Sequence, residues 1–204
     1  VAIPEFNTRF TRQMLIDTQP KDFNTLVRLS GFSHGTDVWL GNARELIVGG
    51  TASVLQTVGC RDDIMLYLIS MGLDPKMSFK IMEAVRKGKV KKGGFQEGWV
   101  EAMEEHGVPQ WYIESLAKIG YLFPKAHAVA YVMMAFRIAW FKVHEPLAFY
   151  ATFFTIRAKA FDAEFCCAGK EAVERKIHEI ENNKDATAVE QNLLVTLEVC
   201  YEFY

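Results

Sequence analysis

A run of cationic residues is the most chemically suggestive feature of the sequence. Five of the seven residues from Arg86 to Lys92 are Lys or Arg, and Gly88 lies among them. A triphosphate is bound by several cations together with exposed backbone N–H groups, and glycine lets the backbone approach a ligand closely. Cations at the end of a helix also complement the helix dipole in a solvated surface. The composition by itself favours this second interpretation.

A second candidate segment begins at Pro124, a residue typical of the start of a helix. Lys125 and His127 then fall in the first turn, where four backbone N–H groups lack partners and the dipole is positive. Cations are unfavourable there unless an anion neutralises them, which suggests a phosphate site. Tyr131 lies four residues after His127 on the same face and could stack on a base or sugar. A core histidine beside a packing tyrosine explains the pattern equally well.

Two further kinds of chemistry are disfavoured. Ser33, His34 and Asp37 have the residue types of a hydrolase triad, but triad members normally come from distant positions in the chain. The histidines have no ligand partners at useful spacing, and the adjacent Asp62 and Asp63 point to different sides of a helix, where they favour the dipole. We therefore expect no catalytic carboxylate set and no metal site.

The composition describes a globular chain that needs a local site to bind nucleic acid. Half of the 204 residues are hydrophobic and the net charge is −2. Residues 1–100 carry 13 Lys/Arg and 10 Asp/Glu, whereas residues 101–204 carry 10 and 15. This balance does not indicate a general nucleic-acid binder.

The cellular location follows from the cysteines and the apolar segments. The sequence has four cysteines and no CxxC pair, which favours buried free thiols in a reducing cytoplasm. No signal peptide is visible at the N-terminus. The most apolar stretch, 128–143, is interrupted by Arg137 and Lys142, so we expect it not to span a membrane.

Helix signals recur along the chain and strand signals do not, which predicts an all-α fold. Asn7 is expected to cap the first helix, Gly31 to end the second before a polar loop over 31–37, and Asp74 with Pro75 to start a third. The predicted helices are 7–18, 22–30, 43–48, 61–71, 75–86, 95–106, 109–119, 124–145, 147–157, 170–182 and 188–203.

At these same segments the sequence resembles the PolC-type alpha subunit of bacterial DNA polymerase III, a C-family replicative polymerase. The matching segments are Ile3–Phe10, Leu29–Ala43, Gly59–Met65, Ile81–Lys89, Phe123–Ala128 and Phe141–Pro146. They follow in register and order, whereas Val90–Trp99 departs from the family pattern, as does Asn7, where glycine is usual.

The resemblance implies the fingers region of the polymerase, which positions the incoming deoxynucleoside triphosphate (dNTP) and the template. Residues 1–157 would form an irregular multi-helix fingers domain, and residues 158–204 a helical extension toward a helix-hairpin-helix DNA-binding region. The implied dNTP-binding residues are Arg86, Lys87, Lys89, Lys125, His127 and Tyr131. The first three match a phosphate-associated basic segment, and the last three match the helix that closes over the nucleotide.

The resemblance also implies what this chain does not supply. The catalytic carboxylates and the Mg²⁺ ions belong to the palm of the full enzyme, so we expect no catalytic residues here and no activity of the chain alone. The implied partners are the dNTP, primer-template DNA and the rest of the polymerase chain. The competing interpretation is a stand-alone helical nucleic-acid-binding module, whose affinity would fall steeply with salt and ignore free nucleotides.

Overall fold

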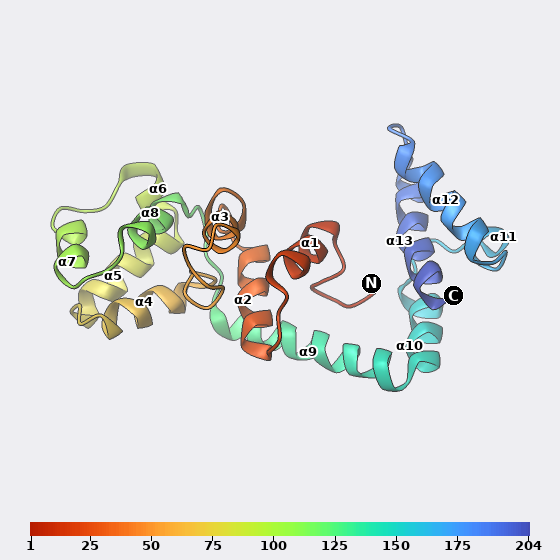
Figure 1. The fold of residues 1–204 in the computed structure, drawn as a ribbon, viewed down its shortest axis with the longest axis horizontal. Helices are drawn as coiled ribbons and strands as arrows, with labels where there is room; N and C mark the ends of the chain where they lie inside the picture. Colours follow the sequence, from red (N-terminus) through yellow and green to blue (C-terminus); the bar gives the residue numbers. More distant parts are fainter. The chain divides into compact units, whose positions relative to one another are not determined.

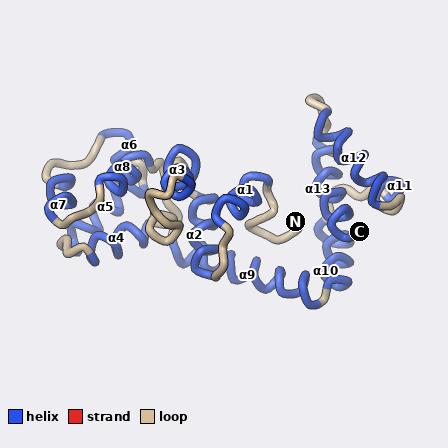
Figure 2. Tube along the Cα trace, viewed as in Figure 1, coloured by secondary structure: helices blue, strands red, loops and turns tan.

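The computed structural model describes all residues 1–204 and confirms the predicted all-α fold (Figure 2). Its only β-type pairing is an isolated bridge between Thr36 and Tyr121. The α-helices are α1 (Arg9–Thr18), α2 (Phe23–His34), α3 (Arg44–Val48), α4 (Arg61–Ser70), α5 (Pro75–Arg86), α6 (Lys89–Gly93), α7 (Trp99–Glu105), α8 (Gln110–Lys118), α9 (Lys125–His144), α10 (Pro146–Thr152), α11 (Ala163–Cys166), α12 (Lys170–Asn182) and α13 (Ala188–Phe203). Two π-helical turns, η1 (Trp39–Ala43) and η2 (Phe153–Arg157), complete the order.

The chain divides into two compact units. The larger unit comprises Thr8–Met133, and the smaller unit comprises Val1–Asn7 with Met134–Tyr204. The boundary falls within α9, which begins in the larger unit and ends in the smaller one. The assignment of residues 1–157 to a fingers region and 158–204 to an extension concerns function and stays a prediction.

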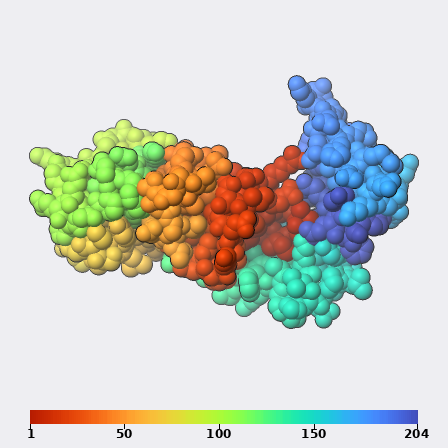
Figure 3. Space-filling view, in the orientation of Figure 1, coloured from red at the N-terminus to blue at the C-terminus, as the bar shows by residue number.

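In the larger unit α4 packs along α5, and α8 packs against α6 and α7 (Figure 1). The space-filling view shows the yellow and green segments of this unit closely packed against one another (Figure 3). Its fully buried apolar side chains include Leu29, Ile64, Leu68, Ile81, Met103 and Leu116. This shared core holds the ends of the helices in place.

In the smaller unit α12 and α13 pack side by side in antiparallel orientation, and α11 packs against both (Figure 1). Val173, Ile180 and Leu197 lie at the centre of their contact. A second cluster joins Phe149 and Phe153 to the N-terminal segment of the chain. The first cluster is built from helix faces whose apolar residues recur at helical spacing.

Local start signals locate several helices as predicted. Asp74 accepts a hydrogen bond from Met77 N at 2.8 Å, and Pro75 follows it at the first helical position. Both α12 and α13 have the predicted bounds. These elements agree with the sequence because a cap and an apolar periodicity are both local features.

The predicted end of the second helix at Gly31 is wrong, because α2 continues to His34. A Cβ atom on Gly31 would lie 2.1 Å from Gly59 O. Glycine is therefore needed here for the close approach of another backbone segment, and not to end the helix. The segment interpreted as a polar loop is consequently half helical.

Other boundaries also differ from the predictions. Thr8 caps α1, while the Asn7 side chain accepts a hydrogen bond from Ala2 N at 2.6 Å. The helix predicted from 95 begins only at Trp99, after Gly98 with φ of 77°. The short helices α6 and α11 were not predicted, since neither is long enough to show a period.

The structure bears on the expectations about the apolar stretch and the cysteines. The helix α9 has 20 residues and is long and apolar enough to cross a membrane by length and composition, unlike the shorter stretch considered from the sequence. A single helix of this length and composition is weak evidence of a membrane span, because core helices of soluble proteins have the same properties. All four cysteines are free, but Cys167 is exposed rather than buried.

Candidate functional site at the start of helix α9

The structure brings the basic run and the start of α9 together. Leu122 N donates to Arg86 O at 3.2 Å, so the end of α5 lies against the segment that leads into α9. On the other side of this segment, Arg61 N donates to Phe123 O at 3.1 Å. The segment thus joins the end of α5 to the start of α4, immediately before Lys125. Residues 36 and 62 positions apart in the sequence thereby become neighbours.

Two of the predicted phosphate-binding cations are already paired. Arg86 contacts both carboxylate oxygens of Glu83, and Lys87 Nζ lies 2.7 Å from Glu83 Oε2. The hydrogen bonds from Arg86, and then from Lys87, lower the pKa of Glu83 to about 2. A triphosphate at Arg86 and Lys87 would have to share these cations with Glu83.

The turn after α5 depends on glycine. Gly88 has φ of 65°, in the left-handed region, and an added Cβ would lie 2.4 Å from Gly120 O. This close approach holds the turn against the residues that precede α9. Lys89 follows it and is exposed, and it forms no ion pair.

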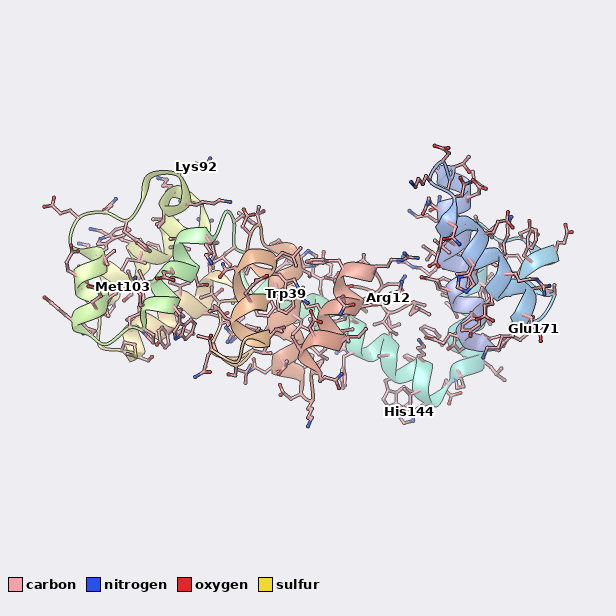
Figure 4. The ribbon with its side chains drawn as sticks, turned by 45° about the horizontal axis from the view of Figure 1, so that its top comes forward. Arg12, Trp39, Lys92, Met103, His144 and Glu171 are labelled. Carbon is pink, nitrogen blue, oxygen red and sulfur yellow. The ribbon has the colours of Figure 1, made fainter.

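The remaining lysines of the run have different surroundings. Lys91 forms an ion pair with Asp37, with 2.6 Å between Nζ and Oδ2. Lys92 is exposed and its side chain lies at the outer edge of the larger unit (Figure 4). Within the run, Lys89 and Lys92 therefore keep their charge available for a ligand.

The first turn of α9 is only partly free. Lys125 N donates to Asp62 Oδ2 at 2.8 Å, so a carboxylate from α4 satisfies one of the N–H groups predicted to lack a partner. Asp62 also supplies negative charge at the positive end of the helix. The N–H groups of Ala126 and His127 have no partner and both residues are exposed. An anion could still bind at this turn.

The pair Asp62 and Asp63 points two ways, as expected for adjacent helical residues. Asp63 Oδ2 accepts from Gly59 N at 3.0 Å and from Cys60 N at 2.9 Å, and it lies 2.7 Å from Arg28 Nη1. Asp63 therefore caps its own helix, whereas Asp62 caps α9. The sequence predicted the favourable charge at the start of α4 but not the second helix that it serves.

An aromatic ladder runs along the start of α9. The ring of Phe123 lies 4.4 Å from that of His127, and His127 lies 4.3 Å from Tyr131. His34 stacks on the other end, with its ring 5.1 Å from Phe123. His127 and Tyr131 are exposed, so the interpretation of these two residues as core packing is wrong. We use the name aromatic ladder for these four residues.

Sequence reasoning missed two members of this ladder. His34 was considered only for a triad, and no sequence signal links it to Phe123, 89 residues away. Phe123 stood beside the predicted helix start, and its spacing of four residues from His127 could have indicated the contact.

The structure assembles neither the triad nor a metal cluster. The Ser33 hydroxyl donates to Ser30 O at 2.9 Å, His34 stacks on Phe123, and Asp37 pairs with Lys91. A hydrolase that uses Ser33, His34 and Asp37 is therefore not supported. No group of three or more His, Cys, Asp or Glu side chains is placed to hold a metal ion.

A family model and the related proteins point to the same family. Residues 1–107 match the model of the bacterial DNA polymerase III alpha subunit finger domain. The whole chain is 57% identical to a protein named DNA polymerase III PolC-type from Caldanaerobacter subterraneus subsp. tengcongensis. It is 54% identical over 99% of its length to the protein of that name from Oceanobacillus iheyensis, and 54% identical over its whole length to that from Streptococcus pneumoniae. The chain spans 14% of the length of each of these relatives.

Proposed function

The chain belongs to the bacterial DNA polymerase III alpha subunit finger domain family, and from that premise we propose that it positions an incoming dNTP and the template for phosphoryl transfer to a primer 3′ end. The triphosphate binds between the end of α5 and the first turn of α9. The base and sugar lie along the aromatic ladder. The chain contributes to DNA-directed DNA synthesis as part of a longer polypeptide.

The observation that carries this proposal is the hydrogen bond from Leu122 N to Arg86 O. It fixes the end of α5 beside the segment that leads into α9, so two distant cationic segments become neighbours. Lys89 and Lys125 supply unpaired charge, and Ala126 and His127 supply backbone donors. Charge and oriented N–H groups in one place are the arrangement that binds phosphates.

The roles of the individual residues follow from this placement. The dNTP-binding set is Arg86, Lys87, Lys89, Lys125, His127 and Tyr131. The four cations offset the triphosphate charge, and Arg86 and Lys87 exchange part of their contact with Glu83 for contact with phosphate oxygens. Tyr131, 47% exposed, supports the base pair by stacking. Positioning and electrostatic stabilisation of this kind carry much of phosphoryl-transfer catalysis.

The metal ions that the family implies do not fit this chain. Phosphoryl transfer in a polymerase uses Mg²⁺ held by convergent carboxylates. Asp62 and Asp63 diverge, and each is engaged in capping a helix. We therefore assign the Mg²⁺ ions and the catalytic carboxylates to a palm in the rest of the polymerase chain, and no catalytic residue to this one.

The implied partners are the dNTP, primer-template DNA and the rest of the polymerase chain, in the cytoplasm and without a membrane. Interruption of the apolar face of α9 by Arg137 and Lys142 supports the absence of a membrane role. The alternative, a stand-alone nucleic-acid-binding module, is favoured by no specific contact. Salt titration distinguishes the two, because a binder of the nucleic-acid backbone would ignore free dNTP.

The test is Lys125→Ala in the full-length polymerase that carries this chain. We expect a higher KM for dNTP or a lower kcat, with the affinity for primer-template largely unchanged. Lys76→Ala is the matched control, since Lys76 is an exposed cation at the opposite end of α5, about 15 Å along the helix from Arg86. Unchanged nucleotide kinetics in Lys125→Ala, or an equal change in Lys76→Ala, would contradict the assignment.

A binding measurement tests the same site without catalysis. Backbone chemical shifts of the chain are followed as dNTP is added, with and without primer-template DNA. We expect changes confined to residues 86–92 and 125–131. If these segments do not respond even when the remaining polymerase chain is present, the residue assignment is wrong.

A further inference from the structure

The smaller unit contains a pocket that shares no lining residue with the candidate dNTP site. Its volume is about 220 Å³, and it is formed by the N-terminal segment, the end of η2 and α13. Its apolar part comes from Ile3, Phe153 and Val195. Phe153 belongs to the buried cluster that also contains Phe149, and this packing holds that wall in place.

The charged part of the pocket is entirely cationic. Arg157 and Lys159 line it, and no Asp or Glu does. This is unusual for its surroundings, because the smaller unit carries 8 Lys/Arg and 12 Asp/Glu. The pocket is therefore free of carboxylates, although the unit that contains it is acidic.

These two cations also lack internal partners. In the same unit Lys142 pairs with Glu202, Lys176 pairs with Glu179, and Lys170 lies over the ring of Tyr201. Arg157 and Lys159 make no such contact and are exposed. Their charge is available to a ligand.

Both cations reach the pocket from one short segment, which lines it together with Ala158. Ala158 lies between them with φ of −62° and ψ of 120°, an extended conformation, and its N–H donates to Phe153 O at 2.9 Å. Asn192 from α13 lines the pocket too and adds an amide group that can donate a hydrogen bond to an anion.

We propose that this pocket binds a phosphate group together with its attached sugar, with Arg157 and Lys159 on the phosphate oxygens and the apolar wall against the sugar. The ligand is one nucleotide unit, from a nucleic-acid strand or from a free nucleotide. A pocket of about 220 Å³ is smaller than the roughly 300–1,000 Å³ of drug-sized ligand sites, so it suits such a small unit. Guanidinium and ammonium groups bind phosphate by charge-assisted hydrogen bonds.

The test uses the chain with three probes: inorganic phosphate, a dNTP and a single-stranded oligonucleotide. Backbone chemical shifts report which residues respond to each. The variant Arg157→Gln with Lys159→Gln removes both cations. The matched control, Arg175→Gln with Lys184→Gln, removes two exposed cations of the same unit that do not line the pocket. A third variant, Val195→Trp, fills the pocket without changing the charge.

We expect shift changes at residues 157–159 and 192–196, lost in the double variant and in Val195→Trp but retained in the control. With the oligonucleotide, the slope of log affinity against log salt should fall by about 0.7 for each lost phosphate contact. A response to the oligonucleotide alone identifies a strand as the source, and a response to dNTP identifies a free nucleotide.

Three results would overturn the proposal. One is the absence of shift changes at the pocket with every probe, which the unmodified chain decides even if a variant fails to fold. Another is equal weakening by the double variant and its control, which would mean general electrostatic attraction. The third is unchanged binding in Val195→Trp. None of these results bears on the site at α9, which lies on other residues.

Discussion

The hydrogen bond from Lys125 N to Asp62 is the contact that most directly links the fold to the candidate site. Asp62→Ala removes the acceptor and its charge from the first turn of α9. Loss of a capping side chain destabilises a protein by about 0.5–2 kcal/mol, and loss of a carboxylate at a helix N-terminus by about 0.3–1 kcal/mol. The geometry, 2.8 Å to a backbone N–H, places the expected loss at about 1–2 kcal/mol.

The same variant should weaken dNTP binding. If the first turn of α9 frays, the ligand must order it again, and about 1 kcal/mol of ordering corresponds to roughly fivefold in affinity. Asp62→Asn keeps an oxygen acceptor and removes the negative charge. We therefore expect Asp62→Asn to bind dNTP at least as tightly as the unmodified polymerase, since the competing anion is gone.

The assays are urea unfolding for stability and dNTP titration of the polymerase for affinity. Asp22→Ala is the control, because Asp22 caps α2 through Thr25 N at 2.8 Å and should lose comparable stability without changing dNTP affinity. Equal weakening of dNTP binding by Asp62→Ala and Asp62→Asn would refute the reasoning. So would an unchanged affinity in Asp62→Ala alongside the expected loss of stability.

Two further predictions concern the helices that support the site. Gly31→Ala should lower the free energy of unfolding by about 1–3 kcal/mol, because the new Cβ would meet Gly59 O at 2.1 Å. Gly93→Ala is the control and should be neutral or stabilising, because the space around Gly93 is open. Equal urea unfolding midpoints for these two variants would contradict the prediction. Glu83→Gln should be less stable than the unmodified chain above pH 4.5, and the difference should vanish as the pH falls toward 2, because bonding to Arg86 lowers the pKa of Glu83 to about 2. Unfolding curves measured across that pH range check the sign, and a difference that does not change with pH would exclude the ion pair as its source.

The local elements could be predicted because their signals are local. Asp74 and Pro75 specify the start of α5 through a side-chain cap and a fixed φ, whatever packs against the helix. The apolar periods of α12 and α13 gave their bounds for the same reason. The family, too, could be identified from residue strings without any structure.

The candidate site, too, was predictable only in its local features. Its cations and aromatic residues could be chosen from the sequence by their type and spacing. Their state of pairing could not, since Lys91 meets Asp37 across 54 positions. The sequence therefore predicted which groups carry charge, but not which of them remain free to bind a ligand.

Sequence by itself determined the all-α class, the family and the residue types at the start of α9. Only the tertiary structure decided that Gly31 lies inside a helix against Gly59, that Asp62 caps a helix 63 residues further along, and that the basic run lies beside α9. The physical reason is the sequence separation over which each interaction acts. Caps and periodicity act within a few residues, whereas a close backbone approach or a distant cap depends on core packing that brings remote segments together.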